Sequence, residues 1–190
     1  MERAIEKLYQ AKKTIYTTHD LALVWNERDE NNLKAKIAYY VKKKDLHRIT
    51  RGVFAKDDAY EVKELATSLY TPSYVSFETV LREAGLIFQH YNETFVAAPY
   101  SMQKTYDEHT FTFRKLKNTV LFANAGILNK DSYAIASPER AFLDTLYLYP
   151  EFYFDNPDVL DWQRCIELVS LYENQQLEKR LYNYHTTYAT

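Results

Sequence analysis

The sequence is poor in glycine and cysteine, and each shortage excludes a class of chemistry. Only 3 glycines occur among 190 residues, so the chain cannot build a glycine-rich loop that cradles phosphates. Its 1 cysteine, Cys165, excludes a disulfide within the chain and a zinc site made of cysteines. No apolar run approaches the ~18 residues that a membrane span requires. The charged, amphipathic N-terminal stretch does not resemble a secretory signal, so we expect a cytoplasmic protein without membrane contact.

The histidines and serines are not arranged as catalytic groups usually are. No two of the 5 histidines lie three to five residues apart, so no helix presents a two-histidine metal site. His109 follows two acids, which favours a solvated turn over a metal ligand. No serine lies in a glycine-flanked elbow, and helix capping with an ion pair explains Glu139 and Arg140 better than catalysis does. We therefore predict that the protein is not an enzyme and has no catalytic residue, metal or cofactor.

The distribution of charge is uneven, although the net charge of −2 is small. Residues 1–56 contain 13 lysines and arginines against 7 acids, whereas residues 57–190 contain 11 against 19. Within the first part, residues 31–56 hold 8 basic residues and a single acid, Asp45. A basic segment in an otherwise acidic protein indicates a surface for a polyanion. The alternative is an ordinary solvated helix face.

Local patterns in residues 1–56 predict three helices followed by a β-hairpin. The first helix covers residues 2–13, and the second begins at residue 21 with Thr18 as its N-cap. The third covers residues 33–44, with Asn31 or Asn32 as its N-cap. A hairpin follows, with its turn at Gly52. This order is typical of a winged helix-turn-helix, so we predict a DNA-binding domain over residues 1–56.

Residues 57–190 predict a second domain of helices and short strands. Helices are expected from Asp57 to about Tyr70, over residues 75–84 with Ser76 as N-cap, and from Ser137-Pro138 to before Pro150. Two more helices are expected over residues 158–172 and 174–184. Four strand-like runs lie between them, FVAAP, TFTFRKL, NTVLFANAG and SYAIAS, and indicate a small antiparallel sheet. The predicted fold class is therefore α+β, a winged helix packed on this mixed domain.

The third predicted helix has one apolar face and one basic face. Its inward stripe comprises Leu33, Ile37, Tyr40, Val41 and the stem of Lys44. Its outward face comprises Asn32, Ala35, Lys36, Tyr39, Lys42 and Lys43. An ordinary solvated face mixes both signs of charge, but this face carries no acid. Such a composition is typical of a recognition helix, because amides and lysines contact base edges and lysines contact phosphates.

The candidate DNA-binding residues therefore come from this helix and the hairpin. They are Asn32, Lys34, Lys36, Tyr39, Lys42, Lys43, Arg48 and Arg51. We expect Asn32, Lys36 and Tyr39 to contribute to the choice of sequence. We expect Lys42, Lys43, Arg48 and Arg51 to contribute mainly affinity, through phosphates.

Three segments of the chain resemble a known family. TTHDLALVWNERDENNLKAKIAYYVKKKDLHRITRGVFA, YTPSYVSFETVLREAGLI and YAIASPERAFLDTLYLYP are together similar to the AbiEi antitoxins of bacterial type IV toxin–antitoxin (abortive infection) operons, which act in phage defence. The resemblance covers roughly residues 15–150. It implies a repressor that binds inverted repeats upstream of its own operon. It also implies an antitoxin that counters a nucleotidyltransferase-like toxin without a stable complex. Full-length members usually carry a longer C-terminal domain than this chain does. The repressor role, which the resemblance places in the winged helix, therefore transfers to this chain more safely than the antitoxin role.

Two other classes of function fit the sequence. A winged helix can serve as a protein-interaction module without specific DNA binding, and the acidic, aromatic-rich second domain could hold a partner. An uncharacterised nuclease or transferase acting on nucleic acid is the weakest alternative. A homodimer would match an inverted-repeat operator, but separate monomers on each half-site are equally compatible with the sequence.

Overall fold

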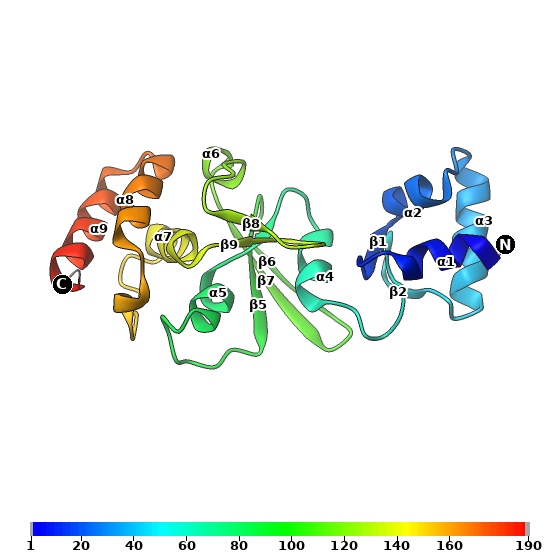
Figure 1. Ribbon diagram of the computed structural model, residues 1–190, viewed down its shortest axis with the longest axis horizontal. Coiled ribbons are helices and arrows are strands. Elements are labelled where there is room, and N and C mark those ends of the chain that lie inside the picture. The colour runs from blue at the N-terminus through cyan, green and yellow to red at the C-terminus, as the bar shows by residue number, and fades with distance from the viewer. Residues whose placement is uncertain (1, 189–190) are drawn as a thin grey trace.

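The computed structural model describes residues 2–188 and shows a chain extended along one axis (Figure 1). The N-terminal helices lie at one end and the C-terminal helices at the other, with a sheet between them. We call residues 2–56 the head and residues 57–188 the body. The fold is α+β, as predicted.

The head contains three helices and a small sheet. Its elements are α1 (Glu2–Gln10), β1 (Ile15–Thr17), α2 (Thr18–Trp25), α3 (Glu30–Lys42), β2 (His47–Thr50) and β3 (Val53–Ala55). The three strands are antiparallel, in the order β1-β3-β2. The predicted hairpin is present, and Gly52 in its turn has a φ of 82°, a conformation that glycine adopts without strain.

The two predicted caps in the head are wrong by one or more residues. Thr17, rather than Thr18, caps α2, because its hydroxyl accepts from the backbone N–H of Asp20 while the carboxylate of Asp20 accepts from the Thr17 N–H. Asp29, rather than Asn31 or Asn32, caps α3, because its carboxylate accepts from the backbone N–H of Asn32 at 2.8 Å. The third helix therefore begins earlier than predicted and includes Glu30.

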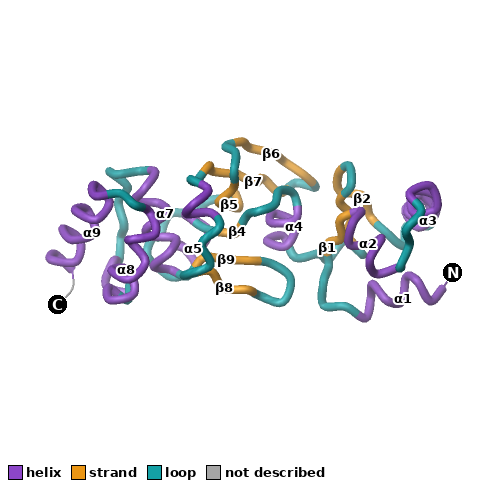
Figure 2. The backbone as a smooth tube through the Cα atoms, turned by 90° about the horizontal axis from the view of Figure 1, so that it is seen from above, coloured by secondary structure: helices purple, strands orange, loops and turns teal. Residues whose placement is uncertain are grey.

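The body is built around a larger sheet. Its elements are α4 (Val62–Ser68), β4 (Tyr74–Val75), α5 (Phe77–Glu83), β5 (Glu93–Ala98), β6 (Met102–Tyr106), β7 (His109–Lys115), α6 (Asn118–Leu121), β8 (Ile127–Asn129), β9 (Ala134–Ala136), α7 (Pro138–Leu148), α8 (Trp162–Val169) and α9 (Gln175–Tyr188). Short 3₁₀ helices cover Pro157–Val159 and Ser170–Tyr172. Helices α7, α8 and α9 lie together beyond one side of the sheet (Figure 2).

The predicted small antiparallel sheet is instead a six-stranded mixed sheet in the order β6-β7-β5-β4-β9-β8. Pairs β5–β7 and β4–β9 are parallel. Local alternation of side chains does not distinguish parallel from antiparallel pairing, which is why the sequence did not reveal this.

Three predictions of local structure in the body also need correction. The run NTVL forms α6 rather than a strand, with Val120 and Leu121 both buried. Helix α4 begins at Val62 rather than Asp57, because Asp57 instead accepts from the backbone N–H of Ala59 in a turn. Ser76 precedes α5, but its hydroxyl makes no cap and donates to Asp144 at 2.8 Å.

Apolar packing joins the head to the body. One core lies within the head and includes Leu33, Ile37, Tyr40 and Phe54. The other face of the head sheet contributes to a second cluster, which we call the junction core. The junction core contains Ile15, Val53, Ala55, Leu65, Ala66, Val96, Ala98, Phe111 and Phe113. The head sheet thus has α3 on one face and the body on the other.

A charged network is fully buried at the start of α7. The Arg140 and Asp144 side chains are both 0% exposed, and Arg140 Nε lies 3.2 Å from Asp144 Oδ1. The remaining guanidinium N–H groups donate to Tyr74 Oη and to the carbonyls of Val120, Ala123 and Ala125. Asp144 also accepts from the hydroxyls of Ser76, Tyr74 and Tyr172. This network ties α7 to β4 and to the segment around α6.

The buried tyrosines of this network predict sensitivity to alkali. Burial raises the pKa of Tyr74 and of Tyr172 well above 10, and the charge of Asp144 raises both further. These hydroxyls stay protonated in the fold but ionise above about pH 10 in the unfolded chain. Their contribution to the unfolding free energy should therefore be constant below about pH 10 and fall as pH rises beyond it.

Urea denaturation at about pH 8 and pH 11 measures this fall. The Tyr172→Phe variant should show a smaller fall than the wild type, because it lacks one of the two hydroxyls. The matched control is Tyr182→Phe, since the Tyr182 side chain is 69% exposed. If stability falls equally in the wild type and in Tyr172→Phe, the Tyr172 hydroxyl is not a source of the alkaline instability.

Candidate nucleic-acid interface

Helix α3 has the two faces that its sequence predicts. Leu33, Ile37 and Tyr40 are buried in the head core, and Val41 packs against them. The residues predicted to face outward are exposed, apart from the half-buried Lys36. The amphipathic pattern therefore identified the orientation of the helix correctly.

The basic residues concentrate at the C-terminal end of α3. Lys42 is the last helical residue and Lys43 is the C-cap, and both are exposed. Lys44 was predicted to lie with its stem in the core, but it is exposed beyond the helix end with a φ of 62°. Lysines in the last turn interact favourably with the negative end of the helix dipole. Lys42, Lys43 and Lys44 are thus all exposed at the C-terminal end of α3, whereas only Lys42 and Lys43 of the three were predicted to face outward.

Tyr39 lies beside these lysines. Tyr39 is 37% exposed as a residue. Its ring packs edge-on against Tyr40 with 5.3 Å between centroids, and its centroid lies 5.0 Å from Lys43 Nζ. A lysine over an aromatic face is a cation–π contact. Tyr39 therefore packs partly against its neighbours and remains partly exposed to a ligand.

The N-terminal half of α3 is less basic than predicted. Lys34 forms an ion pair with Glu30 at 3.1 Å, one turn earlier. Lys36 Nζ lies 4.8 Å from the centroid of the Trp25 ring on α2, so this lysine partly packs between the two helices. Asn32 is exposed, but Asp29 and Glu30 precede it. The predicted absence of acids holds for the middle and the end of the helix but not for its first turn.

The hairpin places Arg48 and Arg51 differently. The Arg48 guanidinium lies 5.4 Å from the centroid of the Phe54 ring, and Phe54 belongs to the head core with α3. Arg48 therefore lies on the α3 side of the head sheet. Arg51 is exposed in the turn beside Gly52, whose carbonyl accepts from the Thr18 N–H at 2.9 Å. The hairpin turn is thus fixed against the N-terminus of α2.

One contact of the hairpin was not predicted. His47, at the start of β2, reaches the β6–β7 turn, where its Nε2 lies 2.8 Å from Asp107 Oδ2. The two residues are 60 positions apart. No local pattern in the sequence indicates a pair at this separation.

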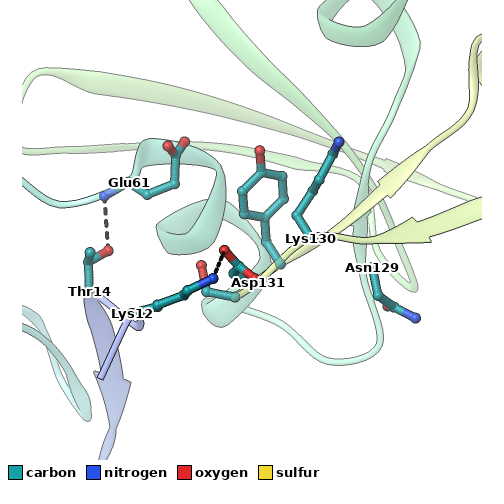
Figure 3. Close-up of a pocket in the computed structure, with 8 residues that line it drawn as sticks. Lys12, Thr14, Glu61, Asn129, Lys130 and Asp131 are labelled. Carbon is teal, nitrogen blue, oxygen red and sulfur yellow. Dashed lines mark hydrogen bonds and ion pairs between the residues drawn. The ribbon is translucent and has the colours of Figure 1, made fainter. Parts of the chain in front are cut away.

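A hollow of about 580 Å³ lies where the head meets the body, as Figure 3 shows. Lys12 and Thr14 line it from the head, and Glu61 and the segment from Asn129 to Tyr133 line it from the body. An ion pair of 2.9 Å joins Lys12 to Asp131 across it. Both signs of charge are present in equal number, so the hollow is no polyanion site.

No helix within residues 2–188 is long and apolar enough to cross a membrane. In the same described part of the chain, no three histidine, cysteine, aspartate or glutamate side chains are grouped as a metal site would need.

Comparison with known proteins supports the fold alone. The sequence matches no model of a protein family and no curated protein. The structure is similar to the crystal structure of the RV2827C protein from Mycobacterium tuberculosis, with a TM-score of 0.52 and 12% sequence identity. The match covers 95% of this chain and 74% of that chain.

Proposed function

We propose that the protein is a winged-helix transcriptional regulator that binds double-stranded DNA through its head. The order of elements in the head supports this proposal, because two helices followed by a short hairpin are typical of a winged helix-turn-helix. In this proposal α3 is the recognition helix and the hairpin is the wing. The observation that carries it is the run of exposed lysines at the end of α3, on a helix whose opposite face is buried.

The contacts divide the candidate residues into three groups. Lys42 and Lys43, with Lys44, neutralise phosphates beside the C-terminal end of α3, and Arg48 and Arg51 contact the backbone or the adjoining groove from the wing. Asn32 and Tyr39 are the exposed candidates for base edges. Lys34 is a secondary candidate because it pairs with an acid, Glu30, and Lys36 is one because it is half-buried against Trp25.

The role in the cell follows from the sequence resemblance. The AbiEi family suggests an autorepressor that binds inverted repeats upstream of its own operon and an antitoxin acting against a nucleotidyltransferase-like toxin. Helices α8 and α9, at the far end from the head, leave Ile166 and Tyr182 exposed at 46% and 69%. Aromatic side chains are enriched at protein interfaces, so the exposed Tyr182 supports a protein-interaction module as the second candidate function.

Fluorescence anisotropy of the purified protein tests the proposal. The probes are the duplex immediately upstream of its coding region and a shuffled duplex, at two salt concentrations. With about five phosphates contacted, log affinity should fall with log salt at a slope near −4.5, and the native duplex should bind far more tightly. Weak binding without preference would reject the regulator and favour the interaction module.

A further inference from the structure

The two strands of the candidate wing are attached to the body unequally. Strand β3 lies in the middle of the head sheet, and its Val53 and Ala55 pack in the junction core. Strand β2 is at the edge of the sheet and pairs with β3 alone, with an irregular register between Arg48 and Thr50. An edge strand with an irregular ladder is held less firmly than a central one. Additional contacts should therefore matter for its position.

Asp107 supplies such a contact from the body. Its Oδ2 lies 2.8 Å from His47 Nε2 and accepts from the Tyr60 hydroxyl at 3.3 Å. The other ring nitrogen of His47 lies 4.0 Å from Asp58 Oδ1. One carboxylate oxygen thus joins β2, the segment between head and body, and the β6–β7 turn.

The turn that carries Asp107 is strained. Asp107 and Glu108 form a two-residue connection between Tyr106 and His109, with φ values of 45° and 69°. Such turns need positive φ at both positions and favour asparagine or aspartate followed by glycine. Glu108 therefore stands in a left-handed conformation that costs ~1 kcal/mol. Backbone strain of this kind persists where surrounding contacts hold it, and here the Asp107 contacts do so.

We propose that Asp107 is a positioning residue for the DNA-binding wing. Acting through His47, it fixes β2 against the body, so that Arg48, the next residue, is held on the opposite face toward α3. Successive side chains of a strand point to opposite faces, which is why anchoring His47 also orients Arg48. The inference rests on the proposed function and adds a link between duplex recognition and a residue of the body.

The surroundings of His47 make Asp107 its principal partner. The carboxylate of Asp107 lies 2.8 Å from the His47 ring, whereas that of Asp58 lies 4.0 Å away and is 96% exposed. The cross-strand neighbour of His47 is the uncharged Ala55. Removing the Asp107 carboxylate therefore removes the shortest of these contacts of the His47 ring.

Tyr60 supports Asp107 as a hydrogen-bond donor. Burial raises the pKa of Tyr60 to about 12, and the adjacent charge of Asp107 contributes to the rise. The Tyr60 hydroxyl therefore stays protonated and donates to Asp107.

The test compares Asp107→Asn with Glu108→Gln. Asparagine tolerates positive φ as aspartate does, so the first variant removes the charge of the anchor without breaking the turn. The second removes the same charge from the neighbouring exposed residue, so it controls for the general effect of charge on DNA affinity. Both variants are full-length chains.

Two readouts separate positioning from charge. The first is amide hydrogen exchange of β2 without DNA, which should be about fivefold faster in Asp107→Asn and unchanged in Glu108→Gln. The second is the ratio of affinities for the native upstream duplex and a shuffled one. This ratio should be about fivefold lower in Asp107→Asn than in the wild type and unchanged in Glu108→Gln. A general charge effect would change both affinities and leave their ratio constant.

The inference is overturned if Asp107→Asn matches Glu108→Gln in the hydrogen exchange of β2, or if the two variants have the same ratio of affinities. If the wild-type protein prefers neither duplex, the proposed function fails. Hydrogen exchange then still decides whether Asp107 holds β2, because it needs no DNA.

Discussion

Replacing Lys42 and Lys43 together with glutamine is expected to weaken binding to every duplex, native or shuffled. Each phosphate neutralised by a lysine contributes about 0.9 to the slope of log affinity against log salt, so the slope should flatten by about 1.8. If the electrostatic contribution vanishes near 1 M salt, this slope corresponds to a loss of about thirtyfold at 0.15 M. The preference for the native duplex should change little, because phosphates carry no direct sequence information.

Anisotropy titrations at several salt concentrations measure both quantities. The matched control is Lys104→Gln with Lys115→Gln, which removes the same charge from exposed positions on the body. That variant should keep the wild-type slope. Both lysines of the test pair lie at the exposed end of α3, so their loss should cost the fold no more than ~1 kcal/mol. An unchanged slope in Lys42→Gln/Lys43→Gln would remove the end of α3 from the interface.

Replacing Arg140 with leucine should have the largest effect on stability. The substitution leaves Asp144 buried without its cation, and it leaves the carbonyls of Val120 and Ala125 without donors. Breaking a buried pair by removing one partner costs about 3–5 kcal/mol. For a chain of this size, that corresponds to a fall in Tm of about 10–15 °C.

Calorimetry and urea denaturation measure this effect. Arg164→Leu is the matched control, because Arg164 also pairs with an acid on its own helix, Glu167, but both side chains are about half exposed. Exposed pairs contribute 0–1 kcal/mol, so this control should remain near wild-type stability. A loss below 1 kcal/mol in Arg140→Leu would mean that the network adds little to the fold.

The sequence predicted features that short-range rules determine. The spacing of Leu33, Ile37 and Tyr40 identified the buried face of α3, because helical periodicity specifies which side chains share a face. Ser137 caps α7 as predicted, since a serine followed by proline is a strong local signal for a helix start.

Features that depend on contacts between distant residues were not predictable. The parallel pairing of β5 with β7 and the burial of Arg140 both follow from how remote segments meet. Charged side chains are rarely buried, so the pattern around Arg140 favours a surface position unless its partners are known. The candidate DNA-binding surface shows the same difference between local and long-range features. The lysines of α3 were identified from the sequence, whereas the contact between Asp107 and His47 was not.

Where local signals compete, they identify the element but not its boundary. Three polar residues, Asp29, Asn31 and Asn32, can each cap α3. Because Asp29 is the N-cap, Glu30 lies inside the helix and pairs with Lys34. The first turn of α3 therefore contains an acid that the predicted helix did not include.

The junction core limits how far the head can be separated from the rest of the chain. Ile15, Val53 and Ala55 are at most 7% exposed, and the side chains that cover them come from the body. A fragment ending at residue 56 would present these three side chains to water on one face of a three-stranded sheet, a surface prone to self-association. Exchange of heads between relatives in evolution would therefore succeed only where both halves of this apolar face change together.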